Sequence, residues 1–306
     1  VCFGSPAAGK TFLTLDMALC IATGKDFHTH AVRQGPVFYI AGEGHNGFAR
    51  RAAAWSKAND IPLQGVPFFK SSRAVIITDD SSVAELIDTI DEMVQQHGEP
   101  QLIVIDTLAR SMGAADENST KEMGAAIRAI DECRDAYDCT VLAVHHTGHS
   151  NKDRARGSSA LLGAVDAEFL VDKWFEDESI AKVEVKFTKM KDAKIPEPMN
   201  FLHKEVELVG ADLEPTTSVV LEPIFDSKPS GKSVDGQRQV VLEEYLKIVD
   251  RTGEEWVKRS VLKSDAATEL NVSQRTVNRT IKDMIGDKTL IEHPNKNNYL
   301  AISGTE

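Results

Sequence analysis

The chain has 306 residues, with 47 Asp and Glu against 35 Lys and Arg, and 42% of its residues are hydrophobic. This length suggests two domains, and the apolar fraction is too high for a chain that stays disordered. The net charge of −12 excludes a surface that is basic throughout, although it leaves room for a local basic patch. Apolar runs are only strand-sized and the four cysteines are scattered, so we expect a cytoplasmic protein without a membrane span or disulfide framework.

Short, β-branched apolar runs alternate with segments of helical periodicity through the first 170 residues. The apolar runs are residues 37–41, 102–105 and 141–144, and the helical segments are 12–22, 49–58, 83–96 and 121–136. Strands that are apolar on both faces are typical of a parallel sheet covered by helices on both sides. We therefore predict an α/β fold with a mostly parallel central sheet. Because a phosphate-loop motif already begins at the fourth residue, we also expect the first strand to lack upstream residues.

The pattern changes after residue 170. Residues 182–187 alternate charged and apolar side chains, and 199–208 and 218–221 have strand character, which predicts an antiparallel extension with one solvated face. Residues 225–237 collect Gly, Pro, Ser and Asp without periodicity, as linkers do. We therefore predict one domain over 1–224, a linker over 225–237 and a second domain over 238–306.

The predicted second domain has the pattern of a winged helix. Helices are predicted over 239–248, 258–270 and 274–285, and strands over 290–292 and 299–302. Ser273 is the predicted N-cap of the third helix, and Gly286 ends it. A three-helix pattern followed by a hairpin predicts a small winged helix-turn-helix domain.

A phosphate-binding motif precedes the first helical segment. Residues 4–11 read GSPAAGKT, which matches GxxxxGK[ST] between a strand end and a helix. In this motif backbone N–H groups and the lysine hold the phosphates of ATP, and the final hydroxyl ligates Mg²⁺. The predicted ATP-binding residues are Gly4, Ser5, Pro6, Ala7, Ala8, Gly9, Lys10 and Thr11.

Two acidic residues follow predicted strands of the same sheet. Asp106 ends the apolar run 102–105, where a carboxylate can hold Mg²⁺ together with Thr11. Glu43 stands between two glycines directly after the strand 37–41, and we predict it to be the catalytic base that activates water. A glutamate in a glycine turn is a weak signal by itself, and it gains weight from the neighbouring motifs.

With these three features in this order, the chain resembles the RecA-like P-loop ATPases, and within them the RepA-like hexameric replicative helicases. The resemblance extends over about residues 1–222. It implies that residues 141–148 (VLAVHHTG) form a strand ending in a polar sensor, with His146 contacting the γ-phosphate. It also implies that adjacent subunits of a ring share each ATP, with Arg156, Lys189 or Lys191 as the trans-acting cation. Many RecA-like rings carry Arg where this chain has Lys191, which shifts the choice toward Arg156.

Other interpretations of these residues stay open. His145, His146 and His149 are common types of metal ligand, but no further ligand stands at a suitable spacing. Residues 110–118 are predicted to form a loop, and in RecA-like rings such loops touch single-stranded DNA. Arg110 is the candidate contact there, because the acids of the loop fit poorly against phosphate.

The charge is unevenly distributed between the predicted domains. Residues 236–306 carry 11 basic and 11 acidic residues, so the preceding part holds the whole excess of acid. Arg275, Arg279 and Lys282 recur on one face of the predicted third helix, which makes this helix a candidate for binding duplex DNA. Docking to a protein partner is the alternative.

Together these features predict an ATP- and Mg²⁺-dependent ring motor, a DNA helicase that acts on single-stranded or forked DNA in phage, plasmid or prophage replication. A non-motor replication initiator, regulator or recombinase-like ATPase is the competing hypothesis. A small-molecule kinase fits poorly with the winged helix and the Glu43 turn.

Overall fold

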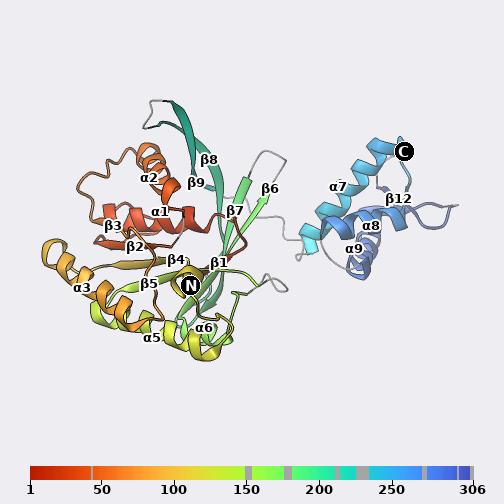
Figure 1. Cartoon of the computed structure of the whole chain (residues 1–306). Helices are drawn as coiled ribbons and strands as arrows, with labels where there is room; N and C mark the ends of the chain where they lie inside the picture. Colours follow the sequence, from red (N-terminus) through yellow and green to blue (C-terminus); the bar gives the residue numbers. More distant parts are fainter. Residues whose placement is uncertain are drawn as a thin grey trace. The chain divides into compact units, whose positions relative to one another are not determined.

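The computed structural model describes residues 1–42, 44–148, 154–175, 181–210, 214–224, 234–270, 274–294 and 296–303. The chain forms two compact units, Val1–Asp226 and Ser227–Glu306, and Figure 1 shows both. Within the described residues, no helix is both long and apolar enough to span a membrane.

The first unit is built around a nine-stranded sheet in the order β3-β2-β4-β5-β1-β6-β7-β8-β9. Its strands are β1 (Cys2–Gly4), β2 (Val37–Ala41), β3 (Phe68–Lys70), β4 (Leu102–Asp106), β5 (Thr140–His146), β6 (Ala167–Phe175), β7 (Ala181–Met190), β8 (Met199–Val209) and β9 (Pro215–Ile224). Neighbouring strands from β3 to β6 pair in parallel, whereas β7, β8 and β9 are antiparallel to their neighbours. The predicted mostly parallel sheet with an antiparallel extension is confirmed.

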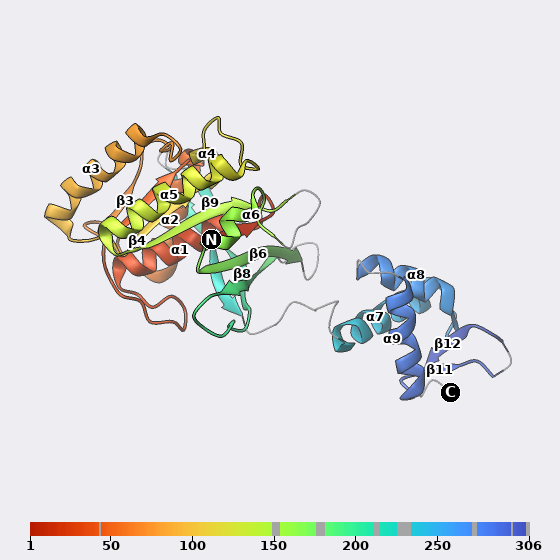
Figure 2. The same ribbon diagram turned by 90° about the horizontal axis from the view of Figure 1, so that it is seen from below.

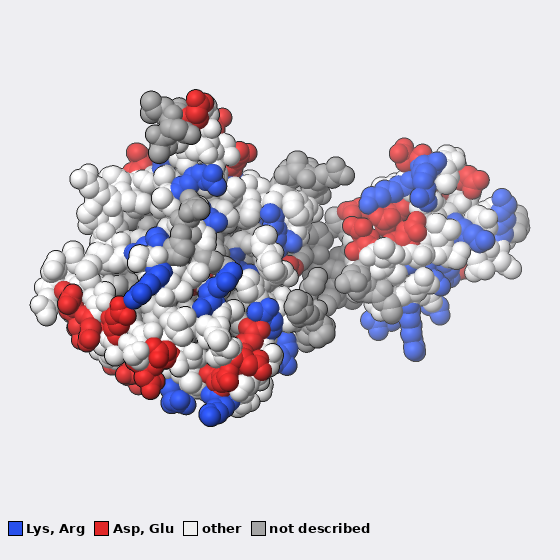
Figure 3. Space-filling view, in the orientation of Figure 1, with Lys and Arg blue, Asp and Glu red and all other residues white. Residues whose placement is uncertain are grey.

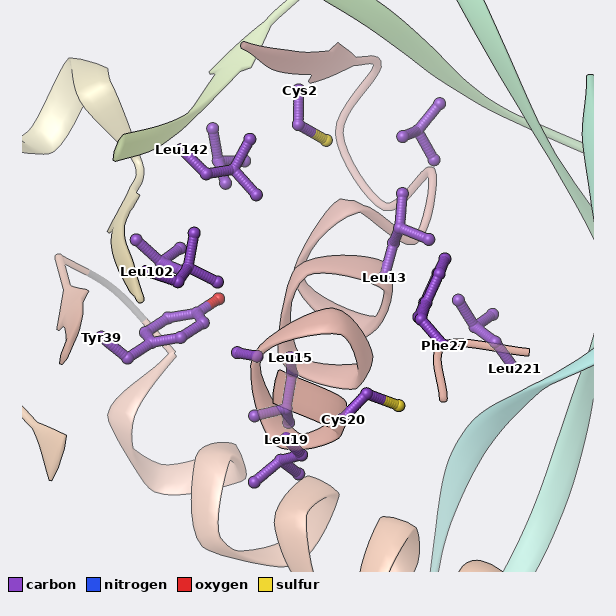
Figure 4. Packing of buried hydrophobic residues seen from close by; sticks show 14 of the residues in the cluster. Cys2, Leu13, Leu15, Leu19, Cys20, Phe27, Tyr39, Leu102, Leu142 and Leu221 are labelled. Atoms are coloured by element: carbon purple, nitrogen blue, oxygen red, sulfur yellow. The ribbon is translucent and has the colours of Figure 1, made fainter. Parts of the chain in front are cut away.

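Helices cover both faces of the parallel part (Figures 1 and 2). They are α1 (Lys10–Thr23), α2 (His45–Asn59), α3 (Asp80–His97), α4 (Leu108–Ser111), α5 (Thr120–Tyr137) and α6 (Ser159–Ala164). Alternate residues of β2 point to opposite sides, so Tyr39 joins the core under α1 and Ile40 joins the core under α3 and α5. Figure 4 shows α1 packed against residues of β1, β2, β4 and β5. The apolar runs of the sequence are thus buried on both faces, as parallel strands require.

Helix ends in this unit follow local capping chemistry. The Asp79 side chain accepts the Ser82 N–H at the start of α3, and the Ser119 side chain accepts the Glu122 N–H at the start of α5. Gly24 ends α1 in the left-handed conformation, with its N–H on the carbonyl of Cys20. These caps lie outside the predicted helical segments, which explains why the observed helices extend beyond the segments at both ends.

The second unit contains three helices and a three-stranded sheet in the order β10-β12-β11. The elements are α7 (Val234–Thr252), β10 (Val257–Lys258), α8 (Arg259–Glu269), α9 (Gln274–Gly286), β11 (Leu290–Glu292) and β12 (Tyr299–Ile302). Val277, Ile281 and Met284 of α9 are fully buried in the core that these elements share. The predicted turn before α9 and its N-cap Ser273 lie outside the described residues.

Two boundaries differ from the sequence prediction. Helix α7 begins at Val234, inside the predicted linker over 225–237, and the hydrogen bond that Thr280 of α9 donates to Gln237 at 2.7 Å anchors its first turn. The predicted loop over 110–118 begins as the last part of α4, because the N–H groups of Arg110 and Ser111 bind the carbonyl of Thr107. Tertiary contacts and short-range backbone bonds therefore override the composition of these two segments.

Candidate functional site

The phosphate-loop motif joins β1 to α1 at the carboxyl edge of the parallel sheet. Gly9 precedes α1 with φ at 100°, a conformation that favours glycine, and the first turn of α1 opens onto the loop. A side chain on Gly4 would meet the carbonyl oxygen of Val171 at 2.2 Å, so β6 passes directly against the loop. The loop is thus built from backbone, the arrangement that an anionic phosphate requires.

Lys10 is folded over the loop. Its Nζ donates to the carbonyl oxygens of Gly4 at 2.9 Å and Ser5 at 2.8 Å, and the residue is only 6% exposed. A buried ammonium on two carbonyls is positioned to exchange them for the oxygens of a bound phosphate, which are stronger acceptors. The role of Lys10 in phosphate binding stays a prediction, and its position over the loop is compatible with it.

Asp106, at the end of β4, is held in a buried chain of hydrogen bonds. The Tyr39 hydroxyl donates to Asp106 Oδ2 at 2.6 Å, and the hydroxyls of Tyr39 and Thr14 lie 3.0 Å apart. In Figure 4 the Tyr39 hydroxyl is turned toward α1, the helix that carries Thr14. Burial, together with the Asp106 carboxylate, raises the pKa of Tyr39 well above its usual value, so this phenol remains a donor.

The residues at this edge fit a hard divalent cation. Thr11 stands in the first turn of α1, and Asp106, only 3% exposed, ends β4 at the same edge of the sheet. A hydroxyl and a carboxylate are the oxygen donors that Mg²⁺ takes beside a triphosphate. Among the described residues, no group of three His, Cys, Asp or Glu forms a separate metal site, and His149 lies outside them.

The end of β5 lies beside the phosphate loop. His146 pairs with Gly4 in the parallel register, the Thr147 N–H donates to the Gly4 carbonyl at 3.2 Å, and the Thr147 and Ser5 hydroxyl oxygens are 3.5 Å apart. The neighbouring His145 is fully buried, and burial lowers its pKa to about 4, so it is neutral at pH 7. His146 is half-buried and is therefore the histidine that stands nearer to the loop surface.

Arg156 binds a residue of its own chain. Its guanidinium is paired with the Glu117 carboxylate through Nε, and through Nη2 at 3.0 Å, and the Arg156 N–H donates to the His146 carbonyl at 2.8 Å. The other two predicted trans-acting cations are more exposed. Lys189 donates to the Leu162 carbonyl at 2.7 Å, and Lys191 pairs with Asp166 at 3.2 Å.

Both lysines lie at the edge of the sheet opposite the phosphate loop of their own chain. Strand β7 is antiparallel to β6, and Lys189 pairs with Glu168 at the start of β6. Since β6 is parallel to β1, this end of β7 corresponds to the amino ends of the parallel strands. The lysines are thus separated from their own phosphate site.

The turn after β2 is packed against α4. Glu43, the predicted catalytic base, lies outside the described residues. The Gly42 N–H donates to the Asp106 carbonyl at 2.6 Å, and a side chain on Gly42 would meet Cβ of Arg110 at 2.7 Å. Gly42 thus joins the end of β2 to the end of β4 and to α4.

The cations of α9 form an exposed face in the second unit. Arg275, Arg279 and Lys282 are exposed and, with Thr276 and Asn278, line a shallow groove of about 440 Å³. Within the described part of the chain, these three cations form no ion pair with an acidic residue. Figure 3 shows Lys and Arg side chains gathered at α9, and acidic side chains gathered over α3 in the first unit.

A phosphate-loop motif at the carboxyl edge of a mostly parallel sheet, with Lys10 on the loop and Asp106 at the end of β4, is typical of a P-loop nucleotide-binding domain. Residues 1–152, which include the phosphate loop and Asp106, match a family model described as an AAA domain. One similar solved structure, described as the crystal structure of the RadB recombinase, is 14% identical and has a TM-score of 0.47. The match covers 66% of this chain and 86% of that chain. No curated protein matches the chain.

Several residues at this site had no assigned role in the sequence prediction. Tyr39 is a polar aromatic residue within an otherwise apolar strand, a signal that could have revealed its bond to Asp106. Glu117 is one of several acids in its segment and gave no such signal.

Proposed function

We propose that the chain is an ATP-hydrolysing DNA motor of the RepA-like helicase type, in which ATP bound at the phosphate loop drives movement on single-stranded or forked DNA. The observation that carries the proposal is the convergence of Lys10, Thr11 and Asp106 on one sheet edge. Hydrolysis also needs a group that orients and deprotonates water, and Glu43 is our candidate for it.

The residues divide the chemistry among them. Lys10 and the N–H groups at the start of α1 would bind the phosphates, and Thr11 and Asp106 would hold Mg²⁺, which would neutralise phosphate charge. Glu43 orients and deprotonates the attacking water in this proposal. His146, beside Gly4, contacts the γ-phosphate and reports its presence to the segment that follows β5.

Assembly into a homo-hexameric ring is part of the same proposal. Lys189 and Lys191 point to this arrangement, because they lie away from the phosphate loop of their own chain and would serve that of a neighbour. Arg156 is the third candidate for this trans-acting role. Native mass spectrometry with a non-hydrolysable ATP analogue should give a closed ring, and a monomer under these conditions would contradict the assembly.

The second unit is proposed to be a winged helix that binds DNA. Its α9 presents Arg275, Arg279 and Lys282 to solvent without an acidic partner among the described residues, and β11 and β12 would form the wing. A helix that presents cations on one face and core residues on the other suits insertion into a DNA groove. Within unit 1, Arg110 is an exposed candidate for contact with single-stranded DNA.

Strand displacement on forked DNA tests this function. The full chain with ATP and Mg²⁺ should unwind the fork, and Lys10→Ala and Glu43→Gln should abolish unwinding because they remove phosphate binding and water activation respectively. DNA-stimulated ATP hydrolysis without unwinding would overturn the helicase and leave a recombinase-like or initiator ATPase that uses nucleotide to control assembly on DNA.

A further inference from the structure

The ion pair between Arg156 and Glu117 joins two segments that follow adjacent strands of the sheet. Glu117 lies after β4 and α4, and Arg156 lies after β5. Both Nε and Nη2 of the guanidinium meet the carboxylate, and the side chains are only 29% and 18% exposed. The pair thus combines one hydrogen bond from Nη2 with close ionic contact at Nε, and its partial burial orients both side chains more strictly than a surface ion pair does.

Backbone contacts reinforce the same junction. The Ser158 N–H donates to the Glu117 carbonyl at 2.9 Å. Gly157 has φ at 92°, and a side chain there would lie 2.6 Å from that carbonyl oxygen. The two segments therefore approach as closely as their backbones allow, which only glycine permits at position 157.

The junction is also connected to the phosphate loop. The Arg156 N–H donates to the His146 carbonyl at 2.8 Å, and His146 pairs with Gly4 of the loop. The Thr147 N–H donates to the carbonyl of Gly4 as well. A chain of direct contacts thus connects the phosphate loop to the end of β5, and the end of β5 to the segment after β4.

Using Arg156 as a cation for a neighbouring subunit would require this pair to break. The Glu117 carboxylate would then stay largely buried without its cation, which is a costly state for an acid. Lys189 and Lys191 face no such cost, since one binds a carbonyl and the other pairs with an exposed Asp166. Arg156 is thus held by a residue of its own chain, whereas Lys189 and Lys191 lie at the opposite edge of the sheet.

We propose that Arg156 is a cis-acting positioning residue, held by Glu117, which makes the segments after β4 and β5 move as one unit with the phosphate loop. This inference rests on the proposed ATPase function and leaves the trans-acting charge to Lys189 or Lys191. Glu117 is the partner on which the positioning depends.

Charge reversal in the full chain tests the pair. Arg156→Glu and Glu117→Arg should each lower kcat for ATP by about tenfold, and the double reversal should bring it back to within about threefold of the parent. A cation that stabilises phosphoryl charge cannot be replaced by glutamate, so the double reversal would stay inactive if Arg156 acted on ATP directly. The exposed pair Arg73 and Glu85 is the matched control, and its reversal should leave kcat unchanged.

Subunit mixing distinguishes cis from trans action. Arg156→Ala and Lys10→Ala chains, mixed in equal amounts, should show no more activity than the mean of the two proteins measured separately. Lys191→Ala mixed with Lys10→Ala is the comparison, and this mixture should exceed that mean if Lys191 acts in trans. Recovery in the Arg156→Ala mixture would overturn the proposal.

Thermal unfolding of the parent, the two single reversals and the double reversal measures the pair without nucleotide. The double reversal should regain part of the midpoint that each single reversal loses, and simple addition of the two losses would contradict the pair. A parent chain that hydrolyses ATP no faster than Lys10→Ala would instead count against the proposed ATPase function, whatever the unfolding data show.

Discussion

The two units differ in how they hold their functional polar residues. In the first unit, Lys10 and Asp106 are buried and Arg156 is half-buried, and each binds another group of the site. In the second unit, Arg275 and Arg279 are exposed on α9, with no acidic partner among the residues that the structure describes. We expect the first arrangement to act through fixed geometry and the second through charge at a surface. Substitutions should therefore affect stability and chemistry in the first unit, and salt-dependent binding in the second.

The largest expected effect comes from Gly4→Ala. The new methyl group would lie 2.2 Å from the Val171 carbonyl oxygen, so the loop or β6 must move. We expect a loss of about 3 kcal/mol in the free energy of unfolding of the first unit, measured by denaturant titration, together with loss of ATP binding. Gly163→Ala is the control, because a side chain there meets nothing within 4 Å in helix α6. Equal stability of the two variants would show that the loop is not packed against β6.

The buried hydroxyl of Tyr39 gives the next effect. Tyr39→Phe removes the donor to Asp106 and the contact with the Thr14 hydroxyl, which should cost about 2 kcal/mol in unfolding free energy. It should also raise the Mg²⁺ concentration needed for half-maximal ATP hydrolysis, since Asp106 loses its orienting partner. Tyr299→Phe in β12 serves as the control and should change neither quantity. An unchanged Mg²⁺ dependence would contradict a role of Asp106 in metal binding.

Stability of the first unit should depend on pH through His145. Burial lowers its folded-state pKa from 6.5 to about 4, so as pH falls below 6.5 the unfolded chain takes up a proton first and stability decreases. Between pH 7 and pH 5 this one residue should remove about 2 kcal/mol of unfolding free energy. In His145→Gln the decrease should be smaller by that amount. Parallel pH curves for the two proteins would show that His145 is not buried in its neutral form.

The exposed cations of α9 should give the smallest and most salt-sensitive effect. Arg275→Ala together with Arg279→Ala should weaken binding of duplex DNA by about tenfold at low salt and reduce the salt slope by about 2, because two phosphate contacts are lost. The control is Lys263→Ala together with Lys288→Ala, elsewhere in the same unit, which has the same net charge as the α9 variant. This control should bind DNA more tightly than the α9 variant does. Fluorescence anisotropy over a range of salt concentrations measures both. Unchanged affinity would favour a protein partner for α9.

Sequence patterns predicted the parallel strands well because these strands are apolar on both faces. Residues 37–41 match β2 without shift, and 102–105 lack only Asp106 of β4. Strand β6 was not predicted, since its polar residues are paired through the fold: Glu168 accepts a bond from the Thr188 hydroxyl of β7 at 2.8 Å. The spacing of apolar residues along the sequence cannot predict such pairing between strands.

The candidate site was predictable where a residue's role follows from its own motif. Lys10 and Asp106 stand where the phosphate-loop and strand-end patterns predict them. Arg156 was assigned from resemblance to a trans-acting role, whereas the structure pairs it with Glu117, which lies 39 residues earlier in the chain. The partner of a charged residue depends on the tertiary fold, and no local spacing encodes it.

Binding of nucleotide by the first unit is the central claim, and calorimetric titration of the full chain with MgADP tests it most directly. The parent should bind one ADP per chain, and Lys10→Ala should weaken binding by a factor of about 100 or more, because it removes a charge-assisted contact to phosphate. The control Lys57→Ala, whose Nζ binds the Glu207 carbonyl at an exposed position, should bind as the parent does. No detectable binding to the parent, or equal affinity of the parent and Lys10→Ala, would contradict the account.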